Sequence, residues 1–121
     1  MANIPEILYK KILVLDGAMG TMVQTYKLNE NDFRGDRFIS HSHDLRGNND
    51  ILCLTQPDIV EEIHHAYFNA GADIIETNTF NATAISQADY DMVDYVYEIN
   101  LTAAKIAKKA AASYDDKIRF V

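Results

Sequence analysis

The chain has 121 residues, of which 48% are hydrophobic, and its 11 basic and 18 acidic residues give a net charge of −7 at pH 7. This composition is typical of a globular protein with a core, and the length predicts one domain or less over residues 1–121. The acidic charge disfavours nucleic acid as a partner, and the lack of an apolar run of about 20 residues disfavours a membrane anchor.

The first part of the sequence predicts a helix, a strand and a loop. Pro5 suits the first turn of a helix, which we place at residues 5–11. The run Ile12–Leu15 is apolar without alternation, and it predicts a strand that is buried on both faces. Residues 25–50 are polar and show neither a helical nor a strand period, so they predict a long loop.

A helix is predicted next, because Thr55 can cap it and Pro57 presets its first turn. Apolar residues then recur along one stripe at helical spacing, and Gly71 is placed to end the helix with a left-handed residue. Residues 72–77 predict a second short buried strand.

The last third of the sequence predicts a loop with a helical turn at 81–90, a long helix over 91–114 and the start of a third strand at 117–121. Strands that alternate with helices imply parallel pairing with right-handed crossovers. Because the third strand would stop on its first residues, we expect the chain to be the N-terminal piece of a longer protein.

Two polar motifs follow the first two predicted strands. In parallel α/β folds, ligands bind at the carboxyl ends of strands. The motif at 16–21 combines a carboxylate, which could hold an ammonium group, with glycines and a helix start whose amides could hold a carboxylate. The motif at 76–81 adds five polar side chains at the same edge. Together they predict a site for the zwitterionic head of an amino acid.

The other candidate functional residues in the sequence give weaker indications of a site. The segment Asp44–Asp50 by itself predicts only a strained loop around Gly47. The two histidine pairs lack further clustered ligands, so no metal site is expected. The single cysteine, Cys53, lies between leucines and is expected to behave as a buried apolar residue. One cysteine and a start without the features of a secretory signal predict a cytoplasmic protein.

The sequence resembles the cobalamin-dependent methionine synthases over about residues 12–121. The matching segments are LDGAMGT (15–21), LNE (28–30), DFRG (32–35), DLRGNND (44–50), LTQP (54–57) and YFNAGADIIETNTFN (67–81). The last segment is highly specific, and the loop at 32–50 favours the cobalamin enzymes over other homocysteine methyltransferases.

The resemblance implies a fold and a reaction. It implies that the chain is the N-terminal portion of a homocysteine-binding (β/α)8 TIM barrel, with parallel strands and crossover helices, truncated at the start of strand 3. In this family a zinc ion held by three cysteines binds the homocysteine sulfur, and the thiolate takes the methyl group of methylcobalamin to give methionine. The positions that match substrate-binding residues are Asp16, Gly17, Ala18, Met19, Gly20, Thr21, Glu76, Thr77 and Asn78.

The resemblance also implies what this chain does not supply. A TIM barrel takes about 250 residues, and none of the family's three zinc cysteines matches a residue here. We therefore expect no catalytic residue in this segment, no bound zinc or methylcobalamin, and no methionine formation from it alone. The expected partners are homocysteine, the remaining barrel and the cobalamin and folate modules of the parent chain. Exposed strand edges would also favour a homo-oligomer.

Two alternatives stay open. The first is a small self-contained α/β ligand-binding module of the flavodoxin-like receiver type, although this fold needs five strands where the sequence predicts three. The second is a non-catalytic module that oligomerises through the long apolar-striped helix. A strand count tests the first alternative, and homocysteine binding separates the second from an enzyme fragment.

Overall fold

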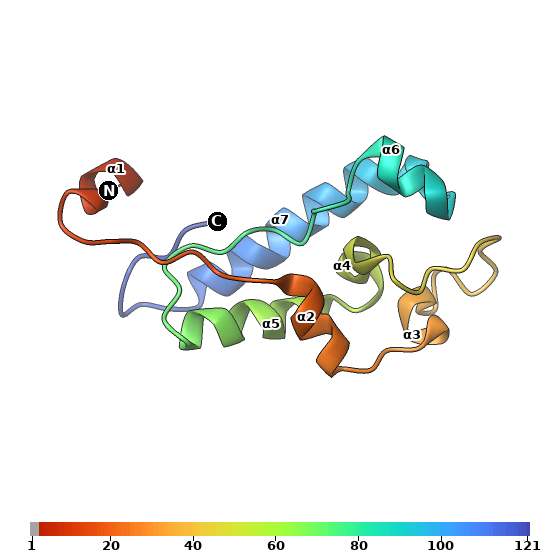
Figure 1. Ribbon diagram of the computed structural model, residues 1–121, viewed down its shortest axis with the longest axis horizontal. Helices are drawn as coiled ribbons and strands as arrows, with labels where there is room; N and C mark the ends of the chain where they lie inside the picture. Colours follow the sequence, from red (N-terminus) through yellow and green to blue (C-terminus); the bar gives the residue numbers. More distant parts are fainter. Residues whose placement is uncertain (1–2) are drawn as a thin grey trace.

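The computed structural model describes residues 3–121 (Figure 1). Its α-helices are α1 (Ile4–Leu8), α2 (Met19–Thr25), α3 (Glu30–Arg34), α4 (Leu52–Thr55), α5 (Pro57–Asn69), α6 (Ala84–Gln87) and α7 (Val96–Ala112). Its 3₁₀ helices are η1 (Asn49–Ile51), η2 (Ala88–Tyr90) and η3 (Val93–Tyr95). The two longest helices, α5 and α7, pack side by side (Figure 1). None of these helices is long and apolar enough to cross a membrane.

The predicted portion of a parallel-stranded barrel is wrong, because no strand forms within residues 3–121 and the regular structure is helical. The sequence predicted strands at 12–15, 72–77 and 117–121. In the structure only single residues of these segments pair, through isolated parallel bridges from Leu15 and Phe120 to Ile74. The segments run extended past one another without forming a sheet.

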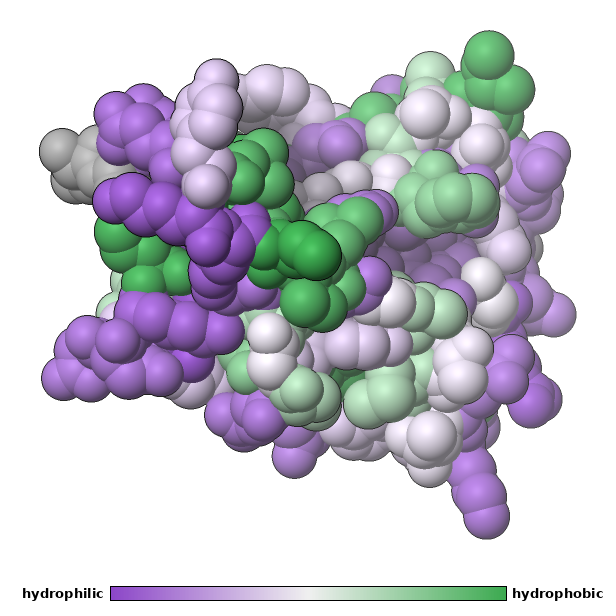
Figure 2. Space-filling model, turned by 60° about the vertical axis from the view of Figure 1, so that its left-hand side comes forward, coloured by the Kyte–Doolittle hydropathy of each residue, from purple (hydrophilic) through white to green (hydrophobic). Residues whose placement is uncertain are grey.

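Uncovered faces explain why these segments do not form a sheet. A parallel strand is normally covered on both faces, but the side chains of Ile12, Val14 and Leu15 are 89%, 52% and 51% exposed. The first and third segments each have a neighbour on one side only, the segment around Ile74. Hydrophobic surface accordingly lies open among hydrophilic side chains on the face shown in Figure 2. The prediction of a strand buried on both faces at Ile12–Leu15 is therefore wrong.

The two long helices lie where the sequence predicted helices. Pro57 is the first residue of α5, and the helix ends two residues before Gly71, whose φ of 113° lies in the left-handed region. Thr55, which the sequence predicted as the cap of this helix, is instead the last residue of α4, and Gln56 is the residue before α5. The long C-terminal helix begins at Val96, five residues later than predicted, after the 3₁₀ turn η3.

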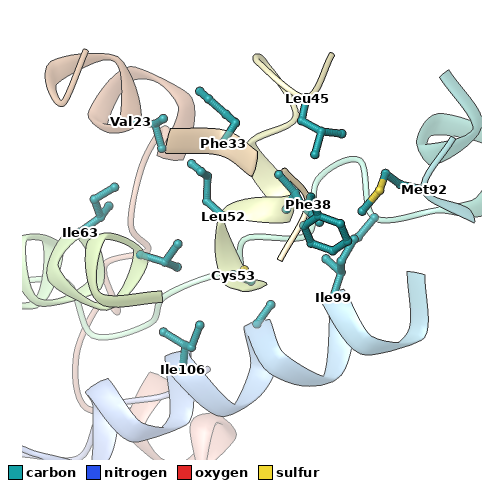
Figure 3. Packing of buried hydrophobic residues seen from close by; sticks show 14 residues of the cluster. Val23, Phe33, Phe38, Leu45, Leu52, Cys53, Ile63, Met92, Ile99 and Ile106 are labelled. Atoms are coloured by element: carbon teal, nitrogen blue, oxygen red, sulfur yellow. The ribbon is translucent and has the colours of Figure 1, made fainter. Parts of the chain in front are cut away.

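The main core is built around α4, which lies between α5 and α7 (Figure 3). Leu52 and Cys53 of α4 are 0% and 1% exposed and share one hydrophobic cluster with Ile63 of α5 and Ile99 of α7. A second cluster around Phe68 joins α5 to the last turns of α7. The helices thus pack against one another through two hydrophobic clusters.

The predicted loop at 25–50 contains a helix that sequence analysis missed. A capping box of Asn29 and Asp32 starts α3. At the end of this helix Arg34 donates to four main-chain carbonyls between residues 38 and 43, at 2.8–3.3 Å. One buried guanidinium therefore organises most of the loop that follows.

Asp73 links three segments that are far apart in the sequence. Its side chain is almost fully buried and accepts hydrogen bonds from Lys11 Nζ at 2.7 Å, Lys117 Nζ at 3.0 Å and the Val14 N–H at 3.0 Å. These donors, that of Lys11 foremost, hold the pKa of Asp73 far below its ordinary value. Asp73 therefore fixes the N-terminal and C-terminal segments against the centre of the chain.

His64 of α5 is fully buried, and neither of its ring nitrogens has a hydrogen-bond partner among the described residues. Burial disfavours the charged ring and, with repulsion from His65, lowers the pKa of His64 to about 4. In the unfolded chain the pKa returns to its ordinary value of 6.5. Between these two values the unfolded chain binds a proton at this position and the folded protein does not.

We therefore expect His64→Leu to stabilise the protein increasingly as the pH falls. From pH 7 to pH 4.5 the wild type should lose about 2 kcal/mol of unfolding free energy relative to the variant. Urea unfolding at both pH values measures this difference, and the comparison cancels the titration of other groups. His43→Leu, at an exposed position, is the control and should show no such trend. A stability difference that stays constant with pH would contradict the expectation.

Candidate functional site

One cavity of about 450 Å³ brings the two predicted motifs together with a third segment. The motifs are neighbours because a parallel bridge pairs Leu15, the residue before the first motif, with Ile74, two residues before the second. The lining residues are Asp16, Gly17, Ala18, Met19, Gly20, Gly47, Asn49, Asp50, Glu76, Thr77, Asn78, Thr79, Phe80 and Asn81. The cavity thus contains all the predicted site residues except Thr21.

The carboxylate of Asp16 joins the two motifs directly. Its Oδ2 accepts a hydrogen bond from the Glu76 N–H at 3.1 Å. Partial burial, with a contribution from the Glu76 carboxylate, raises the pKa of Asp16, while the N–H donor opposes this rise. A cationic ligand group beside Asp16 would relieve both unfavourable effects.

A second carboxylate, that of Asp50, is almost fully buried in the cavity wall. Its Oδ2 accepts a hydrogen bond from the Asn81 N–H at 2.9 Å, yet burial raises the pKa of Asp50 to about 6. The cavity therefore holds the carboxyl groups of Asp16, Asp50 and Glu76, and no lysine, arginine or histidine is among its lining residues. This charge distribution favours a ligand with a positive group.

Buried contacts of Asn78 hold part of the cavity wall in place. Its buried Nδ2 donates to the main-chain oxygen of Asn49 at 2.8 Å and to the Cys53 sulfur at 3.6 Å. The Cys53 thiol in turn donates to the main-chain oxygen of Asn78 at 3.7 Å. These contacts fix the segment that follows Ile74 against α4 and η1.

Burial raises the pKa of the Cys53 thiol to about 12, despite the opposing hydrogen bond from Asn78. We therefore expect Cys53 to resist alkylation by iodoacetamide at pH 8 in the folded protein and to react fully in 6 M guanidinium chloride, because the thiolate is the reactive form. Peptide mass spectrometry measures the labelled fraction. Rapid labelling of the folded protein would contradict the assignment of Cys53 as a packing residue.

The turn at Gly17 and Ala18 is held by a tyrosine of α5. Tyr67 Oη donates to the Ala18 main-chain oxygen at 2.9 Å, and a Cβ at Gly17 would lie 3.3 Å from the same hydroxyl. This close approach explains the glycine. The helix that follows, α2, starts at Met19 without a side-chain cap, so the N–H groups of its first turn have no side-chain acceptor. Thr21 is exposed and lies outside the cavity lining.

A buried pair of amide side chains holds the third segment in place. Asn48 Nδ2 donates to Gln87 Oε1 at 2.8 Å, and Gln87 Nε2 donates back to Asn48 Oδ1 at 3.1 Å. Gln87 Nε2 also donates to the main-chain oxygen of Asn81 at 3.1 Å. The pair therefore ties the segment with Asp50 to the end of the second motif.

Sequence analysis missed part of this site. Gly47, Asn49 and Asp50 belong to the segment that was expected to be only a loop, and they line the cavity. The available signal was the polar run at 44–50, which the resemblance had already matched to a family segment. Its position beside the other motifs depends on long-range contacts that no local pattern contains.

The described residues do not fit the zinc ion that the family resemblance implies. Zinc sites use several thiolate, imidazole or carboxylate ligands, and residues 3–121 contain no group of three such side chains that could hold a metal. The thiol of Cys53 is buried, protonated and directed at a main-chain oxygen. We therefore assign no step of a reaction to zinc on these residues.

Comparison with known proteins shows the family of the chain. The family model for "Homocysteine S-methyltransferase" matches residues 13–121. Among solved structures, the oxidised form of the homocysteine methyltransferase MmuM from Escherichia coli is similar, with a TM-score of 0.67 and 24% sequence identity. This match covers 89% of the present chain and 33% of the MmuM chain, so the chain spans about a third of that structure. The chain belongs to the homocysteine S-methyltransferase family.

Proposed function

We propose that the protein transfers a methyl group to homocysteine and that the acidic cavity binds the amino-acid head of this substrate. Membership of the family supports the reaction class. The observation that carries the assignment to the cavity is its lining, which combines three carboxyl groups, no cationic side chain and the start of α2. An ammonium group and a carboxylate on one carbon atom match these two features.

Each part of the lining has a proposed role. Asp16 accepts a hydrogen bond from the substrate ammonium, and Glu76 and Asp50 add negative potential around it. The N–H groups at Gly17–Gly20 face the substrate carboxylate. Thr77 and Asn78 form the wall, and the contacts of Asn78 to Asn49 and Cys53 keep this wall in place. The segment thus binds and orients the substrate.

We further propose that methylcobalamin is the methyl donor and that zinc is bound outside residues 3–121. The donor assignment is supported by the resemblance of residues 32–50 and 54–57 to the cobalamin-dependent methionine synthases. Zinc, when bound, supplies a cation that favours the homocysteine thiolate. Within residues 3–121, the proposed chemistry is limited to holding the substrate.

Calorimetric titration tests the binding proposal. L-Homocysteine is compared with 4-mercaptobutanoate, which has the same thiol and carboxylate but no ammonium group. We expect the affinity for homocysteine to exceed that for 4-mercaptobutanoate by at least about tenfold, the value of one charge-assisted hydrogen bond. Equal affinities, or no binding of homocysteine, would contradict the proposal.

The donor is tested separately by methionine formation from homocysteine and methylcobalamin. The full-length protein is expected to be active and residues 1–121 alone to be inactive. Activity of the full-length protein with a different donor only would contradict the cobalamin assignment and leave the homocysteine assignment standing.

A further inference from the structure

A second cleft, of about 340 Å³, adjoins the acidic cavity and has the opposite charge. Lys27 and Arg46 line this cleft, and no aspartate or glutamate does. Gly47 and Asn49 line both spaces, so the two are direct neighbours. In a chain with a net charge of −7, two cations without an acidic neighbour in the lining produce a local positive potential.

The two cations are not used for structural ion pairs. Neither Lys27 nor Arg46 forms a salt bridge with any residue in the range 3–121. The main chain of Arg46 is nevertheless fixed, because its N–H donates to Glu30 Oε2 at 2.7 Å while Leu45 N–H donates to Oε1 at 2.7 Å. The charge of Glu30 is paired with Arg34, at 2.7 Å. The guanidinium of Arg46 therefore remains available to a ligand.

Lys27 occupies a position where its backbone is unfavourable. Its φ of 52° places it in the left-handed region, which is less favourable for a residue with a side chain than for glycine. Val23 and Phe33 also line the cleft, but each is only 4% exposed, so the open surface of the cleft is mainly polar. The cleft is thus a polar space with a cationic rim.

We propose that this cleft binds an oxyanion, a carboxylate or a phosphate. Arg46 offers two parallel N–H donors to the oxyanion, and Lys27 offers a point charge. Because the cleft shares a wall with the homocysteine cavity, its occupant is the anionic part of the methyl donor. This donor role rests on the proposed methyl transfer, whereas the anion binding does not.

The test titrates the full-length protein with inorganic phosphate and with glutarate at low ionic strength. At least one probe should bind, and its affinity should fall by about tenfold or more in the double variant Lys27→Gly, Arg46→Gln. The control Lys108→Gln removes an exposed charge of α7 that has no ion pair among the described residues and should change nothing. Tighter phosphate binding favours a phosphate-bearing occupant, which methylcobalamin is, whereas tighter glutarate binding favours a carboxylate-bearing occupant and would contradict methylcobalamin as the occupant of this cleft. Binding of neither probe, or an equal loss in the control, would overturn the proposal.

A second measurement separates this proposal from the proposed function. Glycine suits the backbone at position 27, so the double variant should keep the thermal stability of the wild type and should bind homocysteine with unchanged affinity. If homocysteine binds but neither anion does, the anion site is wrong and the homocysteine site stands. If an anion binds at the cleft but homocysteine does not bind, the anion site stands and the proposed function is wrong.

Discussion

Replacing Asp73 by alanine is expected to lower the free energy of unfolding by about 3 kcal/mol, and Tm by roughly 10 °C. The reason is that one buried carboxylate accepts hydrogen bonds from Lys11, Lys117 and the Val14 main chain. Its removal leaves these donors, from two distant segments, without their shared acceptor. Main-chain hydrogen bonds, such as those from Asp73 N–H to the Val14 oxygen and from Phe120 N–H to the Asp73 oxygen, still join the segments, so we expect a loss of stability rather than unfolding. Chemical unfolding at pH 7 measures the loss.

The effect of Asp73 should also depend on pH in one direction. The pKa of Asp73 in the folded protein lies below the ordinary value of 3.8. Its stabilising contribution is therefore complete above about pH 5 and is lost as the pH falls from there towards the pKa of the folded protein. The difference between wild type and Asp73→Ala should therefore shrink in acid. Glu98→Ala, which removes an ion pair with Arg37 in which the two side chains are 44% and 45% exposed, is the control and should cost less than about 1 kcal/mol. Equal losses in the two variants would contradict the assigned role.

The helices could be predicted from sequence because their signals are local. For α5 the proline at its first position, the apolar stripe and Gly71 all lie within one stretch of chain, and the structure has the helix there. The missed helix α3 had an equally local signal, the capping box of Asn29 and Asp32. Apolar periodicity, which predicts the longer helices, does not reveal α3, because a helix of five residues is too short to show a period.

The strands could not be predicted in this way, since a strand requires neighbours on both sides. Ile12–Leu15 has the composition of a buried strand, but whether it is covered depends on other segments. The candidate site shows the same limit. The sequence placed Asp16 and Glu76 after neighbouring extended segments, and the structure joins them by a hydrogen bond. Asp50 could not be placed with them, because its position depends on the buried contact between Asn48 and Gln87.

The second large effect is expected for Asp16→Asn, which should weaken homocysteine binding by about 2 kcal/mol, or roughly 30-fold. Asparagine has nearly the same shape, and its side-chain oxygen can still accept the hydrogen bond that Asp16 receives from the Glu76 N–H. The turn should therefore persist, and the loss would measure the negative charge alone. Asp89→Asn, which removes a charge from an exposed residue of η2, should leave the affinity unchanged.

A double comparison then assigns the charge to one group of the ligand. If Asp16 contacts the ammonium, the substitution should weaken homocysteine binding and leave the binding of 4-mercaptobutanoate unchanged or slightly stronger, because the removed charge repels the ligand carboxylate. The preference for homocysteine should thus nearly disappear in Asp16→Asn. If both ligands lose the same affinity, Asp16 supports the shape of the cavity and another carboxylate, Asp50 or Glu76, holds the ammonium. The difference between the loss of binding free energy for homocysteine and that for 4-mercaptobutanoate distinguishes these two outcomes, because it cancels any effect of the substitution on folding.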